Sequence, residues 1–505
     1  MVRLKLAGWH LELSTDVEEQ QSQTETPFEG LAFGKHIIIY AAGNGLIILF
    51  GFVQVFIIAK YLSIEDYGYW QTFLLYAGYY GILHLGFIDG ILLRWAGKTI
   101  EKVGSEIRIA LSFLMIQQII IIIPLCTFIL VFTHPPFQSL ALLVLGYALV
   151  SNVADFFMFT VQAVKRFGLL TLALISKSLV LLLFVIVLLI IDHMSYSYVI
   201  IALLISYLLF IIFYAFQFRH YLSTGKSPVS QLWAYGEKTI KIGVFVTLSG
   251  LVFILASSID RFIVSTYFTI EQFAIYTFAF TATLVAYTFI DAISRVFLPY
   301  IALIAHEVRT QLYYWAKSAI MVAWAIIIVI YFPGAKLVEL YLPAYINSLP
   351  IIRILLCAIG FYSLIQIVQA NYFKTFGKQF LLFLVGAIVL TFLVVSEIVA
   401  LKVWGGLESV AAAYCVGMIV WYVAGEFSLQ TTLHQNANKL WKGILIPICF
   451  ISIFWLADFV SDRYIIQMGV YLGFFLVITF LFLRQEIRDL VIIAGKYGEM
   501  LIRKG

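Results

Sequence analysis

Charge is scarce in this sequence: only 12% of its 505 residues are Asp, Glu, Lys or Arg, whereas 63% are hydrophobic. A soluble globular chain carries about twice that share of charge, at ~25%. The composition therefore excludes a soluble domain for most of the chain. Long apolar runs such as IIIIIPLCTFIL and LVLLLFVIVLLII account for the excess. They lack the alternation of apolar and polar residues that a membrane-spanning β-barrel requires.

The sequence also lacks the short motifs that carry metal, redox or nucleotide chemistry. Its four cysteines, Cys126, Cys357, Cys415 and Cys449, lie far apart, so no pair has the spacing of a metal or redox site. The eight histidines form no HxxxH or HExxH pattern, and the sequence has no P-loop. We therefore expect no cofactor, no catalysis and no ATP-driven step within this chain.

The apolar stretches predict the fold class. One helical crossing of a bilayer needs about 20 apolar residues, and the sequence holds enough of them for about fourteen crossings. We predict an all-α polytopic membrane protein with spans near 36–59, 71–93, 109–132, 139–162, 168–191, 196–218, 241–264, 273–300, 314–334, 349–373, 379–401, 409–430, 441–459 and 464–483.

The basic residues predict the orientation of these spans. Lys and Arg gather in the two tails and the even-numbered connections, whereas the odd-numbered connections carry only Lys60, Lys336, Lys402 and Arg463. Basic residues favour cytoplasmic loops, so both termini are expected in the cytoplasm. The formal net charge of +5 then reflects loops facing an anionic membrane surface. This net charge therefore does not indicate a nucleic-acid partner, and we expect none.

A repeat divides the chain into two halves. The stretch YLSIEDYGYW at 61–70 returns as YFTIEQFAIY at 267–276, with Tyr, Ile and Glu in register. Six crossings separate the copies, so both run in the same direction through the bilayer, as parallel repeats do in some transporters. We predict a cytoplasmic tail at 1–35, a first six-helix bundle at 36–218, a cytoplasmic linker at 219–240, a second six-helix bundle at 241–430, two further helices at 431–484 and a cytoplasmic tail at 485–505.

Three segments resemble a known family. The segment AKYLSIEDYGYWQTFLLYAGYYGILHLGFIDGILLRWAGK (59–98) resembles the N-terminal signature of Wzx-type polysaccharide and O-antigen flippases. These flippases belong to the multidrug/oligosaccharidyl-lipid/polysaccharide (MOP) exporter superfamily. SSIDRFIVSTYFTIEQFAIYTFAF (257–280) and INSLPIIRILL (346–356) are similar to the starts of that family's second bundle and tenth helix. The resemblance covers nearly everything after residue 35 and implies a V-shaped transporter that works by alternating access.

The resemblance also implies a function. The substrate would be an oligosaccharide on polyprenyl (undecaprenyl) pyrophosphate, moved from the cytoplasmic to the outer leaflet of a bacterial plasma (inner) membrane for cell-surface polysaccharide biosynthesis. Expected partners are this lipid-linked oligosaccharide, membrane lipids, and a polysaccharide polymerase with its chain-length machinery. An H⁺ or Na⁺ gradient is a candidate driving force, and facilitated flipping down a concentration gradient fits equally well.

Two other functions stay open at this point. A cation-coupled multidrug or small-molecule exporter of the same fold would need carboxylates rather than an excess of basic groups in its cavity. A membrane glycosyltransferase or polysaccharide polymerase would need a sizeable outer domain to hold its substrates, and the longest expected outer connection is only the short segment 335–348.

A pyrophosphate head and sugars cannot cross hydrocarbon unaided, because burying charged and unpaired polar groups is costly. We therefore expect a polar, cationic cavity between the bundles. Arg295 is the leading candidate to line it, with Asp291 on the same helix face. The repeat offset of 206 residues makes Asp89 the counterpart of Arg295. Arg94 and Lys98 follow at the expected cytoplasmic mouth. Alternatively, Asp291 and Arg295 neutralise one another, and Arg94 and Lys98 only anchor the loop.

Further polar groups are expected deep in the first half. Lys177 and Asp155 lie in adjacent spans, where they either pair with one another or contact the cargo or a coupling ion. Tyr76, Tyr79, Tyr80 and His84 in the second span suit sugar contacts or helix packing. The same two alternatives apply to the polar residues of the tenth span, Gln366, Gln369 and Asn371.

Four charged residues of the second half are candidates for gating or coupling. Asp260, Arg261 and Arg353 fall near outer helix ends, where an Asp260–Arg353 latch would close a gate. Glu426 is expected to be a lone buried carboxylate, which in membrane transporters often marks a proton or cation path.

Overall fold

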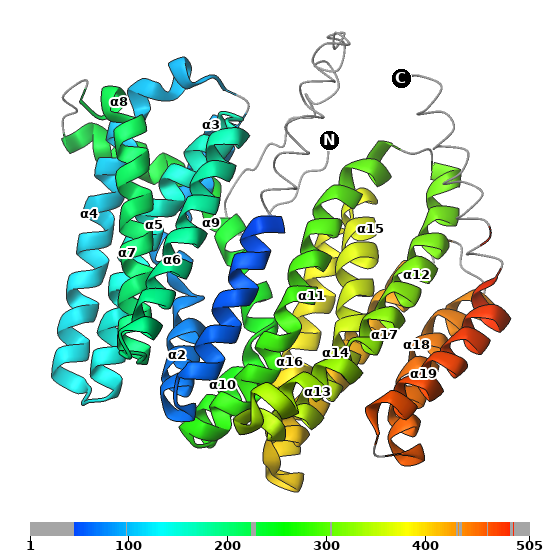
Figure 1. The fold of residues 1–505 in the computed structure, drawn as a ribbon. Coiled ribbons are helices and arrows are strands. Elements are labelled where there is room, and N and C mark those ends of the chain that lie inside the picture. The colour runs from blue at the N-terminus through cyan, green and yellow to red at the C-terminus, as the bar shows by residue number, and fades with distance from the viewer. Residues whose placement is uncertain are drawn as a thin grey trace.

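A computed structural model of the chain describes residues 45–96, 98–223, 229–303, 306–430, 433, 437–461, 463–484 and 488, apart from certain side chains within these ranges, Arg295 among them. Every regular element in these ranges is helical. The helices run between two ends of the molecule, which we name from Figure 1. The upper end carries α8 (Arg219–Ser223), and the lower end carries α10 (Ile259–Tyr267). The predicted tail at 1–35 and nearly all of that at 485–505 lie outside the described residues.

The helices of the first half follow one another with short turns. They are helix Gly45–Tyr61, α2 (Ile64–Ala77), the 3₁₀ segment η1 (Tyr80–His84), α3 (Phe87–Trp95), α4 (Ile100–Phe132), α5 (Phe137–Ala163), α6 (Phe167–Ile190), α7 (Tyr196–Gln217) and α8.

The second half and the two further C-terminal helices also follow one another in sequence with short turns. They consist of α9 (Val229–Ala256), α10, α11 (Ile270–Leu303), α12 (His306–Val329), α13 (Tyr331–Tyr341), η2 (Pro343–Ser348), α14 (Leu349–Ser363), the π-helical segment η3 (Leu364–Gln369), α15 (Ala370–Thr375), α16 (Gln379–Trp404), α17 (Gly406–Gln430), α18 (Ala437–Val460), α19 (Tyr464–Ile478) and η4 (Thr479–Leu483).

The membrane-spanning plan agrees with the sequence prediction. Eleven helical stretches in the described part of the chain are long and apolar enough to cross a bilayer. The remaining three predicted spans correspond to helix Gly45–Tyr61, to the interrupted segment α2–η1–α3 and to the consecutive helices α9 and α10. The prediction of an all-α polytopic membrane protein is confirmed.

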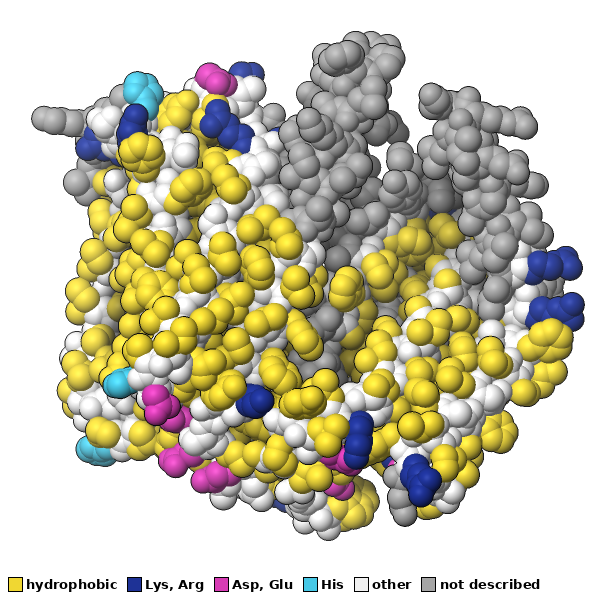
Figure 2. Space-filling view, viewed as in Figure 1, with side chains coloured by type: hydrophobic (Ala, Val, Ile, Leu, Met, Phe, Trp, Pro, Cys, Tyr) yellow, Lys and Arg dark blue, Asp and Glu magenta, His cyan; other side chains and the backbone are white. Residues whose placement is uncertain are grey.

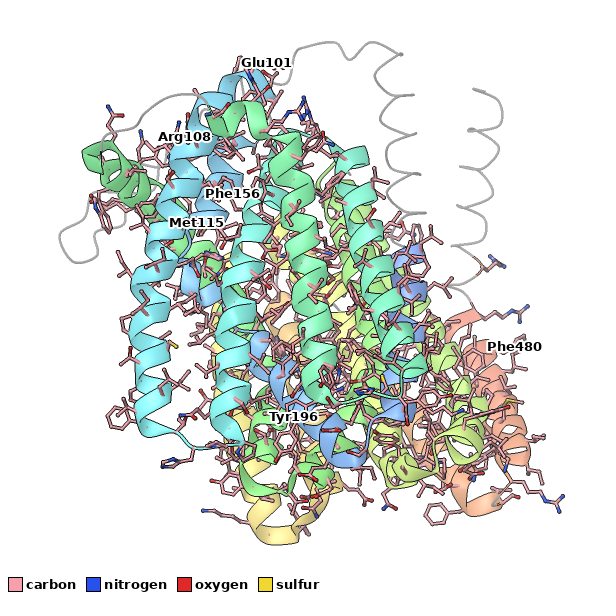
Figure 3. All side chains as sticks on the ribbon, turned by 60° about the vertical axis from the view of Figure 1, so that its left-hand side comes forward. Glu101, Arg108, Met115, Phe156, Tyr196 and Phe480 are labelled. Carbon is pink, nitrogen blue, oxygen red and sulfur yellow. The ribbon has the colours of Figure 1, made fainter. Side chains whose placement is uncertain are left out.

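The surface has the pattern of a membrane protein. Hydrophobic side chains cover the middle of the visible face, and charged side chains lie toward its upper and lower edges (Figure 2). Figure 3 shows the same order along single helices: Glu101 and Arg108 of α4 lie toward the upper end, Met115 lies lower, and Tyr196 begins α7 at the lower end. Charged and aromatic residues favour the two interfaces of a bilayer, and aliphatic residues favour its interior.

Two hydrophobic cores explain the overall shape. One core fills the upper part of the first half and includes Trp95 and Phe156. The other unites the second half with first-half residues near the lower helix ends, such as Tyr67, Leu140 and Val199. The two halves are therefore joined at the lower end, and apart from α9, which packs on α3 and α4 of the first half, their ribbons diverge toward the upper end in a V (Figure 1).

The repeated stretches meet at this junction. Each begins a helix: the Ser63 hydroxyl accepts a hydrogen bond from the Asp66 amide at α2, and Thr269 and Gln272 cap one another at α11. The two helices pack so closely that a Cβ atom at Gly68 would lie 2.5 Å from the Ile270 carbonyl oxygen. The repeat therefore forms the contact between the halves at the lower end.

We predict that Gly68→Ala destabilises this contact. The added methyl group meets a backbone oxygen that cannot rotate away, and overpacking of this kind costs about 1–3 kcal/mol. The thermal unfolding temperature of the purified protein in detergent should fall. Gly146→Ala in α5 is the matched control, because a Cβ atom there meets no atom within 4 Å. Equal unfolding temperatures for the two variants would contradict the close packing of α2 and α11.

Candidate functional site

The second predicted span is interrupted, whereas its repeat counterpart in α11 is continuous. Between η1 and α3 the backbone passes through Leu85 and Gly86, which have positive φ angles of 50° and 86°. This leaves carbonyl groups without helical partners. The side-chain amides of Gln118 and Gln117 on α4 donate to the carbonyls of Leu83 and His84, at 3.0 and 3.2 Å. Irregular backbone at membrane depth persists only where the protein supplies such partners.

Asp89 follows the interruption and lies at the contact between α3 and α9. Its carboxylate accepts a hydrogen bond from the Thr247 hydroxyl of α9, and the His84 ring nitrogen lies 4.0 Å away. The predicted opposition of Asp89 and Arg295 stays a prediction, because the Arg295 side chain lies outside the described part of the structure. Asp291 accepts a hydrogen bond from the Tyr362 hydroxyl at 3.0 Å.

Arg94 links three helices at the upper end. It donates to Thr239 of α9 at 2.5 Å and to Glu106 of α4 at 3.2 Å. Its guanidinium lies 4.3 Å from the ring centre of Tyr235 on α9. These contacts hold α3 and α4 against α9. Lys98, by contrast, is exposed beyond the end of α3.

Lys177 and Asp155 form no ion pair in the structure, so the predicted pairing is wrong. The Asp155 carboxylate accepts a hydrogen bond from the Tyr80 hydroxyl at 2.5 Å. The Lys177 ammonium lies 4.0 Å from the ring centre of Tyr207. Each charge therefore has an aromatic neighbour, and the half-buried ammonium is held by a cation–π contact rather than by a carboxylate.

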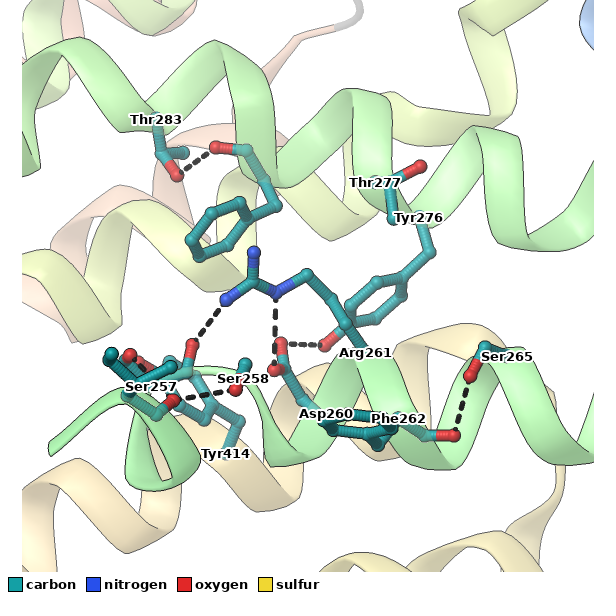
Figure 4. Close-up of polar contacts among 12 residues, drawn as sticks. Ser257, Ser258, Asp260, Arg261, Phe262, Ser265, Tyr276, Thr277, Thr283 and Tyr414 are labelled. Carbon is teal, nitrogen blue, oxygen red and sulfur yellow. Dashed lines mark hydrogen bonds and ion pairs between the residues drawn. The ribbon is translucent and has the colours of Figure 1, made fainter. Parts of the chain in front are cut away.

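A charged cluster lies near the lower junction, on α10 and its neighbours (Figure 4). Asp260 is fully buried, accepts a hydrogen bond from Tyr276 at 2.8 Å and lies 3.8 Å from the Arg261 Nε atom. The Arg261 guanidinium donates to the Ser257 carbonyl at 2.6 Å and lies 3.6 Å from the Phe280 ring centre. The cluster joins the α9–α10 turn to α11.

Glu397 of α16 belongs to the same cluster and lacks a partner. It is fully buried, and neither carboxyl oxygen hydrogen-bonds to any residue in the described ranges. The nearby charged group that acts on it is Asp260, one of whose own oxygens also accepts no hydrogen bond. This cluster thus contains two buried carboxyl groups and one arginine, Arg261, which pairs with Asp260.

The predicted Asp260–Arg353 latch is wrong. Arg353 pairs instead with Asp458 of α18 at 2.5 Å and donates to the Phe454 carbonyl at 2.7 Å. It therefore attaches the C-terminal helices to α14. Sequence gave no indication of this partner, because α14 and α18 are distant along the chain.

Glu426 is not a lone carboxylate, so this prediction is also wrong. The Lys317 ammonium lies 2.6 Å from it, and the hydroxyl of Tyr313 and the amide of Gln369 donate to it at 2.5 and 3.1 Å. Lys317 lies inside the predicted span 314–334, yet it was not among the candidate residues named from the sequence. Its position within that span was the signal that could have identified it.

Most of the other predicted polar contacts serve packing. Asn371 donates to the backbone and hydroxyl of Ser294 at 3.1 and 3.0 Å, and Gln369 joins the Glu426 cluster. Tyr76 and Tyr79 pack against Phe262 of α10. These contacts fix the positions of neighbouring helices.

No protein-family model matches the sequence, and no curated protein matches it. Solved structures do match. The lipid II flippase MurJ in its inward closed conformation has a TM-score of 0.66 at 14% identity, covering 89% of this chain and 100% of that chain. A multidrug resistance MATE family transporter of the MOP superfamily, inward-facing, has 0.57 at 14% identity over 77% and 94%. A mutant of the Vibrio cholerae MATE transporter VcmN has 0.53 at 15% identity over 80% and 97%.

These structures are membrane transporters and flippases rather than enzymes. The chain therefore has the fold of these transporters, in the V-shaped arrangement that the resemblance implied. At 14–15% identity, the similarity to these solved structures establishes the fold alone.

We predict that breaking the buried Lys317–Glu426 pair destabilises the protein more than removing it whole. Lys317→Met leaves an uncompensated buried carboxylate, which costs about 3–5 kcal/mol. The double variant Lys317→Met/Glu426→Met should recover part of this loss in thermal unfolding. Lys241→Met is the control, because the Lys241–Glu237 pair is exposed and should leave the unfolding temperature unchanged. A double variant as unstable as the single one would contradict the pairing.

Proposed function

We propose that this protein is a flippase of the Wzx type. It would move a polyprenyl (undecaprenyl) pyrophosphate-linked oligosaccharide from the cytoplasmic to the outer leaflet by alternating access, for cell-surface polysaccharide biosynthesis. The observation that carries this proposal is the match to the lipid II flippase MurJ. It covers 100% of that chain and 89% of this one, more than the matches to the MATE transporters cover.

The charges support this cargo. The Lys177 ammonium is half-buried and forms no ion pair with a described residue. Cationic groups of this kind suit an anionic pyrophosphate head, whose sugars would pass between the diverging halves while the polyprenyl chain stays in lipid.

The same reasoning gives the location. We place the protein in the bacterial plasma membrane with its upper end and both termini in the cytoplasm, because basic residues such as Arg94, Lys98 and Arg108 gather at the upper end. A polysaccharide polymerase with its chain-length machinery would then receive the cargo on the outer side. We assign the chain no catalytic step.

A cation-coupled multidrug exporter is the alternative function. The observation that favours it is the buried Asp260–Glu397 pair, since such exporters need carboxylates, and the MATE transporters share the fold.

We predict that Arg295→Ala abolishes flipping of a labelled polyprenyl-pyrophosphate oligosaccharide in proteoliposomes, because the pyrophosphate loses its cationic partner. Lys402→Ala, an exposed basic residue near the lower end, is the control and should flip the lipid at the wild-type rate. Flipping by the Arg295→Ala variant would contradict the role of Arg295. A wild-type protein that leaves the lipid unmoved and exports a cationic dye would favour the exporter.

We further propose that Asp260 and Glu397 bind the coupling H⁺ or Na⁺. Two buried carboxyl groups, of which Asp260 pairs with Arg261, hold an excess negative charge when both are ionised, and one cation would neutralise it. The Tyr276 hydroxyl donates to Asp260, which leaves the unpartnered oxygens of the pair for the cation.

We predict that Glu397→Gln makes transport insensitive to the ion gradient, because the neutral amide no longer needs a compensating cation. Initial flipping rates should be measured with an H⁺ gradient, with a Na⁺ gradient and with neither. Glu408→Gln, at an exposed position, is the control and should keep the wild-type response. A Glu397→Gln variant that still responds to the gradient would exclude this site.

A further inference from the structure

His84 lies inside the interruption of the second span. Its side chain is buried, and the next residues, Leu85 and Gly86, carry the positive φ angles of the break. The Gly86 amide donates a hydrogen bond to the Nδ1 atom of His84 at 3.1 Å. Nδ1 therefore acts as an acceptor and carries no proton, so the ring is neutral with its proton on Nε2.

The other ring nitrogen faces the contact between α3 and α9. Nε2 of His84 lies 4.0 Å from an oxygen of Asp89. The Thr247 hydroxyl of α9 donates to the same oxygen. One carboxylate oxygen thus lies between an imidazole in the break and a hydroxyl on the helix that begins the second half.

The surrounding contact tolerates little displacement. A Cβ atom at Gly86 would lie 2.5 Å from the Val244 Cα atom, and a Cβ atom at Gly90 would lie 2.1 Å from the Thr239 carbonyl oxygen. Backbone therefore packs on backbone along α3 and α9. A change in the turn at Gly86 must move one helix relative to the other.

Few charged groups surround His84. Asp89 on α3 is the one described ionisable group that acts on it. The helix α4 contributes the amides of Gln117 and Gln118, and α9 contributes Thr247. On α5, Asp155 is hydrogen-bonded to Tyr80, and Lys177 on α6 lies over Tyr207.

We propose that His84 is a proton-binding site whose protonation loosens the contact between α3 and α9. This inference rests on the proposed alternating access and is independent of the cargo. A proton on Nδ1 would face the Gly86 amide, so two donors would oppose one another and the turn would rearrange. The imidazolium would also attract Asp89 away from Thr247. Both effects weaken the contact, which is therefore firm when His84 is neutral and looser below its pKa.

The test is hydrogen–deuterium exchange of the full chain in lipid nanodiscs at pH 5.5 and 7.5, corrected for intrinsic exchange rates. For segment 79–95 we expect the opening constant of the wild type to be about tenfold larger at pH 5.5 than at pH 7.5. An unperturbed histidine titrates near pH ~6.5, so about one pH unit of this interval is linked to protonation of the opened state, which corresponds to a factor of about ten. His84→Asn should lose this response, because the Asn side-chain oxygen can accept from the Gly86 amide but does not titrate.

His193→Asn is the control, because His193 is an exposed histidine near the lower end, and the variant should respond as the wild type does. Should His84→Asn not fold, His84→Gln replaces it, because its side-chain oxygen can also accept from the Gly86 amide and does not titrate, so this variant should lose the response as well. A wild-type segment whose exchange does not depend on pH, or an unchanged response in His84→Asn or His84→Gln, would overturn the proposal. Because exchange needs no cargo, an intact pH response in a protein that fails to flip the lipid would support this inference and refute the proposed substrate.

Discussion

Hydrocarbon offers no hydrogen-bond partners, so every polar group in the membrane-spanning part must find one within the protein. The interrupted second span shows how this constraint is met. The break exposes the carbonyls of Leu83 and His84, and two adjacent glutamines of α4 donate to them. Because these glutamines belong to another helix, the break is stable only when the first half is assembled. Its position in turn places Asp89 against α9.

The same constraint organises the buried charges. Lys317 with Glu426, and Arg353 with Asp458, are ion pairs that tie helices together within the second half and its C-terminal extension. Glu397 departs from this pattern, since its oxygens are buried without a hydrogen-bond partner among the described residues. A buried charge without compensation is costly, which is why we propose this carboxyl group, together with Asp260, as the site of a coupling cation.

Close backbone contacts connect these features across the molecule. Gly68 packs on α11 where the halves join at the lower end, and Gly90 packs on α9 toward the upper end. Between them, the Tyr79 hydroxyl contacts the Ser258 hydroxyl at the α9–α10 junction. The start of η1 and the junction between α9 and α10 are thus in direct contact.

Composition and hydropathy were enough to predict an all-α membrane protein with about fourteen crossings, because the bilayer fixes the length and polarity of a spanning helix. The repeat at 61–70 and 267–276 likewise predicted equivalent elements, which the structure brings together as α2 and α11. Helical periodicity, however, tells which residues share a face of one helix and not which helix lies opposite. Lys317 and Glu426 are 109 residues apart, so only packing could pair them. Only packing could separate Asp260 from Arg353 or leave Glu397 without a hydrogen-bond partner among the described residues. The sequence by itself determined that most of the chain lies in a membrane as helices, and about how many times it crosses. The tertiary structure decided which charges compensate one another, because buried electrostatics acts between neighbours in space.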